Sequence, residues 1–96
     1  MAAENKIETA FVRHVKHLGG EVRKLKWIGR TGAPDRIVFF PPDVVFFVEF
    51  KAPGKKLDSH QKREHKRLKR FGMKVYTIDS IADAVMTANL EHRAFF

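Results

Sequence analysis

A carboxylate and an ammonium stand at the end of an otherwise apolar segment. Residues 44–50 read VVFFVEF, which is typical of a strand buried on both faces, yet Glu49 and Lys51 lie two residues apart and therefore share a face. A carboxylate buried among Phe and Val destabilises a fold by several kcal/mol unless it is neutralised, paired or bound to a cation. Either the strand emerges into solvent here, with the two charges paired to each other or to surface groups, or Glu49 belongs to a charged site.

A second carboxylate opens the preceding apolar segment and favours the charged site. Asp35 follows Pro34 at the start of DRIVFF, and the PPD sequence at 41–43 predicts a turn before residues 44–52. If the two segments form an antiparallel hairpin, Asp35 and Glu49 meet at one edge of the sheet. Two hard oxygen ligands with open coordination positions suit Mg²⁺ or Mn²⁺. Lys51 could then orient a water or offset charge on phosphate oxygens.

Hydrophobic spacing and turn residues predict the elements that must position these side chains. In chain order they are a helix over 6–18, strands over 21–30, 35–40 and 44–52, a helix from Asp58 or Ser59 to Gly72, a strand over 73–78 and a helix from Asp79 or Ser80 to residue 90. The order αβββαβα predicts one α/β domain over residues 1–96, a small mixed β-sheet flanked by helices. The segment 91–96 has no assignment.

Apolar residues at helical spacing predict which faces of the first and last helices are buried. They are Ile7, Phe11, Val15 and Leu18 in the first helix and Ile81, Ala84, Val85 and Ala88 in the last. Trp27 and most of the nine Phe residues are expected in the core, whereas Phe95 and Phe96 could cover a dimer interface.

Composition indicates a small cytoplasmic domain with a polyanionic partner. Nineteen Lys and Arg against eleven Asp and Glu give a net charge of +8, which favours nucleic acid over an anionic membrane surface. The absence of cysteine excludes disulfides and thiolate metal sites. The N-terminal residues lack the apolar run of a signal peptide, and no stretch is long enough to span a membrane.

Basic residues concentrate on the second predicted helix. Like charges this dense repel one another, so phosphates are the expected partner, bound through the nucleic-acid backbone rather than through base edges. The basic residues of this segment are Lys55, Lys56, Lys62, Arg63, Lys66, Arg67, Lys69 and Arg70. Arg30 and Arg36, which flank the loop before Asp35, could clamp the scissile phosphate, and His60 is the one histidine that could contact a phosphate.

The acidic and basic residues at the strand ends resemble a known nuclease motif. GAPD at 32–35, fourteen residues from Asp35 to Glu49, and EFK at 49–51 resemble the PD-(D/E)xK nuclease superfamily. An upstream helical Glu, the G-x-P-D loop, E-x-K and a following helical Gln together resemble its VRR-NUC (virus-type replication-repair nuclease) family. The matching positions are Glu8, Gly32, Pro34, Asp35, Glu49, Lys51 and Gln61.

The resemblance implies a restriction-endonuclease-like core and divalent-metal-dependent phosphodiester cleavage in structured DNA, as in DNA repair. Stand-alone members of this size resemble Holliday-junction resolvases and work as homodimers, here in a bacterial or phage-infected cell. By resemblance, Glu8, Asp35 and Glu49 would hold Mg²⁺ or Mn²⁺, and the backbone carbonyl of Phe50 could be an extra ligand. Asp35, Glu49, Lys51 and Gln61 would be the catalytic residues.

Two of these positions have an ordinary alternative explanation. Glu8 could be a first-turn acid favoured by the helix dipole, and Gln61 could form a capping box with Asp58. For the chain as a whole, the alternatives are a non-catalytic, basic nucleic-acid-binding module and a protein directed at RNA. The first of these predicts salt-dependent binding that is indifferent to EDTA.

Overall fold

Three helices and four strands make up the computed structural model, which describes residues 2–93. The elements are α1 (Ala3–His17), β1 (Glu21–Lys24), β2 (Arg36–Phe40), β3 (Val44–Phe50), α2 (Ser59–Arg70), β4 (Lys74–Ile78) and α3 (Ile81–Arg93). This order confirms the predicted αβββαβα succession.

The strands form one mixed sheet in the order β1-β2-β3-β4. β1 pairs with β2 and β2 with β3 in antiparallel fashion, whereas β3 and β4 are parallel. The short turn between β2 and β3 fixes the hairpin register, with Phe40 opposite Val44 and Arg36 opposite Val48. A parallel pair requires a crossover connection, and the segment that contains α2 supplies it between β3 and β4.

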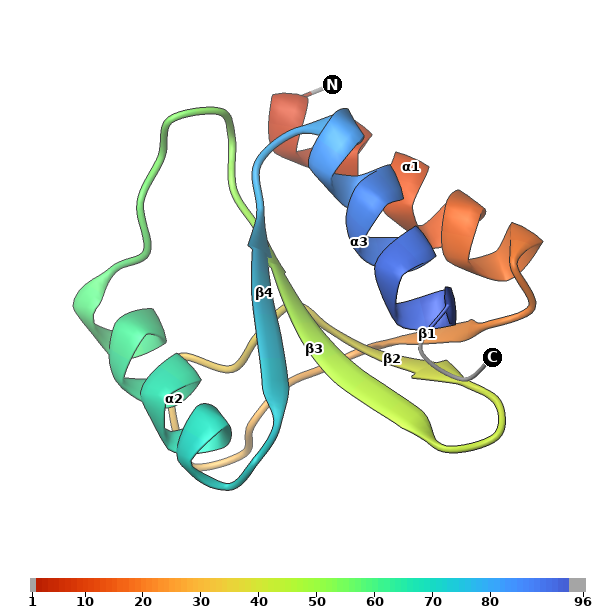
Figure 1. Cartoon of the computed structure of the whole chain (residues 1–96). Coiled ribbons are helices and arrows are strands. Elements are labelled where there is room, and N and C mark those ends of the chain that lie inside the picture. The colour runs from red at the N-terminus through yellow and green to blue at the C-terminus, as the bar shows by residue number, and fades with distance from the viewer. Residues whose placement is uncertain (1, 94–96) are drawn as a thin grey trace.

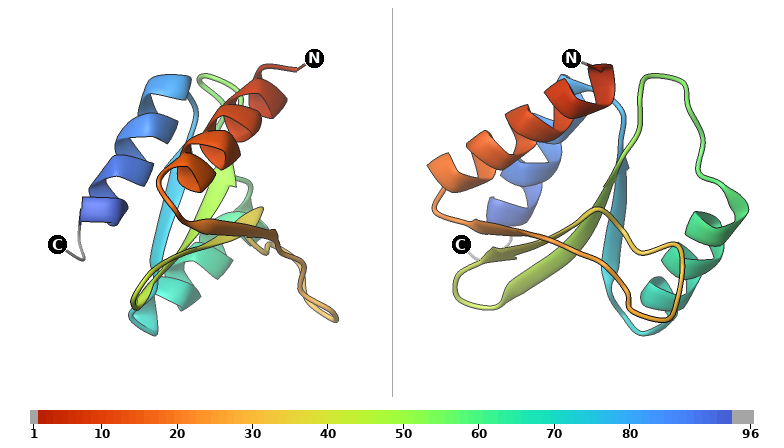
Figure 2. Two further views of the ribbon diagram at one scale, coloured as in Figure 1. Left: turned by 90° about the vertical axis from the view of Figure 1, so that its right-hand side faces the viewer. Right: turned by 180° about the vertical axis from the view of Figure 1, so that it is seen from behind.

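The helices lie on opposite faces of the sheet. α1 and α3 lie side by side on one face and α2 covers the other, as the views in Figure 1 and Figure 2 agree. Side chains of β3 alternate between the two layers. Phe50 meets Phe11 of α1, with ring centroids 5.5 Å apart, whereas Glu49 faces α2 and lies near His65.

The main core fills the space between the sheet and the α1–α3 layer. Ala84 and Ala88 are fully buried, and their small side chains let α3 approach α1 closely. Gly20 is required by packing, because a Cβ there would lie 2.6 Å from the ring of Phe40 and 2.7 Å from Val15. The buried cluster comprises Ile7, Phe11, Val15, Val22, Val38, Phe40, Phe46, Val48, Phe50, Ile78, Ala84 and Ala88.

The strand predicted over 21–30 is too long. Pairing ends at Lys24, and after one more contact, from the Leu25 N–H to the Asp35 carbonyl, the chain forms a loop with positive φ at Gly29 and Gly32. In this loop Ile28 is almost fully exposed. The other predicted elements match within a few residues, and α3 continues to Arg93.

Some predicted core residues are not in the main core. Ile81, at the first position of α3, and Phe71, the residue that follows α2, are both exposed. Trp27 is half-buried within the loop. The proposed interface residues Phe95 and Phe96 lie outside the described residues.

Candidate active site

Asp35 and Glu49 come together as the predicted hairpin requires. Extending the β2–β3 register by one residue beyond Arg36 and Val48 sets Asp35 opposite Glu49. Residues directly opposite in an antiparallel pair project to the same face, here the face covered by α2. Oδ2 of Asp35 accepts a hydrogen bond from the Phe50 N–H at 2.8 Å, which anchors this carboxylate at the end of β3.

Glu49 is a buried carboxylate, with only 2% of its surface exposed. Its Oε2 accepts a hydrogen bond from Nε2 of Gln61 at 3.2 Å, and its Oε1 lies 3.4 Å from Nε2 of His65. Burial raises the pKa of Glu49 above its ordinary value; the His65 hydrogen bond opposes this shift, and the neighbouring Asp35 adds to it. A cation that approaches both acids would stabilise the charged form of Glu49, because it offsets the repulsion from Asp35 and the cost of burial.

Gln61 holds the start of α2 and the Glu49 carboxylate at the same time. Its Oε1 accepts from the Asp58 N–H at 3.0 Å, and its own N–H donates to Oδ1 of Asp58 at 2.8 Å, which completes a capping box. Because a primary amide has separate donor and acceptor atoms, Nε2 remains available for Glu49. The two alternative interpretations of Gln61 are therefore compatible.

His65 belongs to this site although its spacing did not single it out. It is 4% exposed on the face of α2 that meets the sheet, one helical turn after Gln61. The signal in the sequence was that interval of four residues between two polar side chains on the inward face of the helix.

Lys51 continues β3 beyond its last assigned residue. Its N–H donates to the Ile78 carbonyl at 2.9 Å, so strand alternation places its side chain on the same face as that of Glu49. The ion pairs among residues 2–93 do not include Lys51, so the simple Glu49–Lys51 pair is not formed. The backbone hydrogen bond from Gln61 is the main cause that lowers the pKa of Asp58, and the charge of Lys51 makes a smaller contribution.

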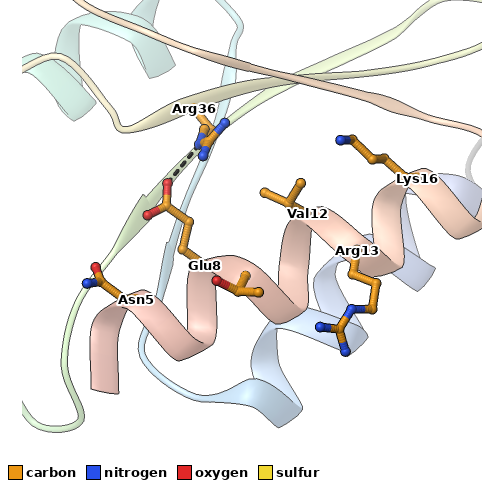
Figure 3. Close-up of a pocket in the computed structure, with 7 residues that line it drawn as sticks. Asn5, Glu8, Val12, Arg13, Lys16 and Arg36 are labelled. Atoms are coloured by element: carbon orange, nitrogen blue, oxygen red, sulfur yellow. Dashed lines mark hydrogen bonds and ion pairs between the residues drawn. The ribbon is translucent and has the colours of Figure 1, made fainter. Parts of the chain in front are cut away.

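Glu8 is held by Arg36 rather than by the acidic pair. Nε of Arg36 donates to Oε2 of Glu8 at 2.7 Å, and both side chains are mostly buried. Figure 3 shows Glu8 pointing from α1 toward Arg36, beside a cavity of about 600 Å³ that Asn5, Val12, Arg13 and Lys16 also line. Arg36 directly follows Asp35, so its side chain projects to the opposite face of the sheet. The Glu8–Arg36 pair therefore lies over the face opposite to Glu49.

The chemistry of the acidic pair fits a hard divalent cation. Two carboxylates face each other at a strand end, and the pKa of Glu49 is raised by its burial and by the adjacent acid. Carboxylate oxygens with room for water are the ligands that Mg²⁺ and Mn²⁺ prefer. Within residues 2–93, no group of three or more His, Cys, Asp or Glu side chains is arranged to hold a metal, which agrees with the separate placement of Glu8.

The predicted phosphate-binding residues divide into two groups along α2. Arg30, Arg63 and Arg67 line a pocket together with Gly29, Thr31 and His60. Lys62 and Lys66 line a different cavity with Leu57, His65, Lys69 and Thr77. Lys55 and Lys56 are exposed in the connection between β3 and α2.

Comparisons with known proteins identify the family and agree with the fold. Residues 2–82 match the family model described as the VRR-NUC domain. The chain is 44% identical over 77 residues to "Putative nuclease p44" of Acyrthosiphon pisum secondary endosymbiont phage 1, a match that covers 80% of this chain and 83% of the relative. A solved VRR-NUC domain superposes with a TM-score of 0.86 at 36% identity, covering 93% of this chain and 97% of that structure.

Within residues 2–93, every helix is too short or too polar to span a membrane.

Proposed function

Because the chain belongs to the VRR-NUC domain family, we propose that it is a divalent-metal-dependent endonuclease that hydrolyses phosphodiester bonds in structured DNA, Holliday junctions included. The observation that carries this proposal is the placement of Asp35 directly opposite a buried Glu49. Fold and family support a nuclease, and the acidic pair supports its dependence on a cation.

Each residue of the site has a role that its contacts support. Asp35 and Glu49 would hold Mg²⁺ or Mn²⁺, and the carbonyl of Phe50, between Glu49 and Lys51 in the chain, is the extra ligand that we propose. The cation, when bound, supplies Lewis-acid stabilisation of charge on the phosphoryl oxygens. Gln61 fixes the orientation of Glu49. Glu8, which the resemblance implied as a metal ligand, is bonded to Arg36 and acts instead through this ion pair, which holds the start of β2 next to Asp35.

Lys51 assists the attacking water. Its side chain lies on the same face as Glu49, where an ammonium can hydrogen-bond to a water and to a non-bridging phosphate oxygen. The water oxygen attacks phosphorus and loses a proton to solvent, the P–O bond to the leaving backbone oxygen breaks, and that oxygen takes up a proton from solvent to leave as a hydroxyl group. The ammonium is not consumed in this step.

The substrate proposal follows from charge and from the phage relative. A net charge of +8, concentrated on α2, supports binding to a DNA backbone in the cytoplasm of a bacterial or phage-infected cell. A four-way junction has two symmetric strands to cut, which suits a homodimer. Exposed apolar side chains at Ile81, Met86 and Leu90 on α3 support such an assembly.

The experiment is cleavage of a four-way junction, a flap, a linear duplex and an RNA by the wild type, Lys51→Ala and Asp35→Ala. The wild type cuts the branched DNA with Mn²⁺ and does not cut it in EDTA, whereas both variants remain folded and bind DNA without cutting it. Cleavage by Asp35→Ala at the wild-type rate would refute the mechanism. Binding without any product under every divalent ion would identify a non-catalytic module, and preferential cutting of RNA would change the substrate class.

A further inference from the structure

A basic pocket lies between the loop that precedes the acidic pair and the exposed side of α2. It has a volume of about 430 Å³ and is lined by Gly29, Arg30, Thr31, His60, Arg63 and Arg67. The pocket is distinct from Asp35 and Glu49, which do not line it. Three guanidinium groups from two separate segments therefore converge on one small space.

A buried carboxylate below the pocket orients two of these arginines. Glu64 is 4% exposed, its Oε1 accepts from Nη1 of Arg67 at 2.9 Å, and the same oxygen lies 3.8 Å from Nη1 of Arg30. About half of each guanidinium-bearing side chain remains exposed, 43% for Arg67 and 56% for Arg30. One carboxylate offsets only one of three positive charges, so the pocket keeps an excess positive charge that faces solvent.

The hydrogen bonds of His60 determine which of its ring nitrogens carries a proton that can be donated to a ligand. Nη2 of Arg63 lies 3.0 Å from Nδ1 of His60, and Oγ1 of Thr31 lies 3.2 Å from the same nitrogen. Because a guanidinium can only donate, Nδ1 must accept, and the ring proton then resides on Nε2. The contact also fixes Arg63 beside the loop, so the guanidinium groups are held before any ligand binds.

The loop reaches α2 only because of a glycine. Gly32 has φ +89°, and a Cβ at this position would lie 2.6 Å from the carbonyl oxygen of His60. This close approach holds the loop against α2, and each of these two segments leads from the pocket to the acidic pair. Thr31 is four residues from Asp35, at most about 14 Å along an extended chain, and His60 directly precedes Gln61, which bonds Glu49.

We propose that this pocket is a phosphate subsite that binds a second phosphate of the nucleic-acid strand and sets its register on the acidic pair. The proposal deepens the proposed nuclease function and rests on it. Prearranged guanidinium groups match phosphate geometry and lose little entropy on binding. Since phosphates along one strand rise by about 3.4 Å each, the bound phosphate lies within about four nucleotides of the scissile one.

The test uses small phosphate probes and a pair of variants with the same charge change. Arg63→Gln removes a pocket arginine, whereas Arg70→Gln removes an arginine of the same helix that does not line the pocket and stacks on Phe71. Binding of inorganic phosphate, thymidine monophosphate and thymidylyl-thymidine is followed by NMR shifts of the arginine Nε–H groups. Metal is absent throughout.

In the wild type and Arg70→Gln, a probe shifts the Arg30 and Arg67 signals, whereas in Arg63→Gln its affinity falls about tenfold, the loss expected for one charge-assisted contact. Tighter binding of the diester assigns the pocket to an internal phosphate, and tighter binding of the monoester assigns it to a strand end. Equal affinities of the two variants, or shifts that do not involve Arg30 and Arg67, would overturn the subsite.

Junction binding in EDTA separates this inference from the nuclease proposal. Arg63→Gln weakens binding about tenfold more than Arg70→Gln does. A protein that binds phosphate in the pocket but cuts no DNA would retain the subsite and lose the proposed function. A protein that cuts DNA while the two variants bind it equally would retain the function and lose the subsite.

Discussion

Nε2 of Gln61 donates a hydrogen bond to Oε2 of Glu49 across 3.2 Å, and this contact ties the first turn of α2 to the acidic end of β3. Oε1 of the same amide accepts from the Asp58 N–H, and the Gln61 backbone N–H donates to Oδ1 of Asp58, which closes the capping box. The start of the helix and the orientation of a buried carboxylate therefore depend on one side chain.

The two roles of Gln61 can be separated by substitution. Gln61→Ala and Asp58→Ala each remove part of the capping box, and each is expected to lower the free energy of unfolding by about 1 kcal/mol. Only Gln61→Ala also frees Glu49, so only this variant should slow cleavage, by about 10- to 100-fold. Urea unfolding and single-turnover cleavage measure the two effects, and an equal loss of activity in both variants would assign Gln61 to the helix alone.

The glycines of the loop before Asp35 are expected to differ in their tolerance of a side chain. Gly29 and Gly32 both have positive φ, but a Cβ at Gly29 meets open space, whereas one at Gly32 meets the His60 carbonyl. Gly29→Ala should cost about 1 kcal/mol for backbone strain, and Gly32→Ala about 3 kcal/mol because the clash is added. Equal destabilisation in urea would show that the loop does not depend on its contact with α2.

The ion pair of Glu8 and Arg36 should contribute measurably to stability because both side chains are less than one-third exposed. A double-mutant cycle with Glu8→Gln and Arg36→Gln should give a coupling free energy of about 1 kcal/mol by urea unfolding. Glu8→Gln should slow cleavage about 10- to 100-fold, as expected for a residue that positions Asp35 through its ion pair with Arg36. Complete loss of activity would instead indicate direct contact with the cation.

Stability in acid should depend on Asp58. Its pKa is lowered below the ordinary value of 3.8, chiefly by the backbone hydrogen bond from Gln61. A carboxyl whose folded pKa is depressed stabilises the protein fully above pH 3.8, and this contribution disappears as the pH falls through the folded pKa. Asp58→Asn keeps a capping oxygen without titrating. The difference in unfolding free energy between the wild type and this variant should therefore be constant above about pH 5 and change only in acid.

The hairpin that assembles the acidic pair could be predicted from sequence because few alternatives exist. Pro41 and Pro42 restrict the turn, the apolar strands on either side fix the alternation, and together they set Asp35 opposite Glu49. The family resemblance then predicted that the acidic pair binds a divalent cation.

Other parts of the site depend on tertiary packing that local sequence does not specify. Glu64 and His65 lie within a run of charges that is typical of a solvated helix, yet both are buried where α2 meets the sheet and the loop before Asp35. Many basic side chains could pair with Glu8, and the fold brings Arg36 to it. The strand predicted through Trp27 ends early because its partner β2 begins only at Arg36, so the residues beyond Leu25 have no strand to pair with.

The most direct test of the account is the shift in unfolding temperature produced by Mn²⁺ in the wild type and in Asp35→Asn. The asparagine can still accept the Phe50 N–H, so the variant should fold as well as the wild type without metal. At a hundredfold excess over its dissociation constant, Mn²⁺ should stabilise the wild type by about 2.7 kcal/mol and leave the unfolding temperature of Asp35→Asn almost unchanged. An equal rise in both proteins would contradict a cation shared by Asp35 and Glu49.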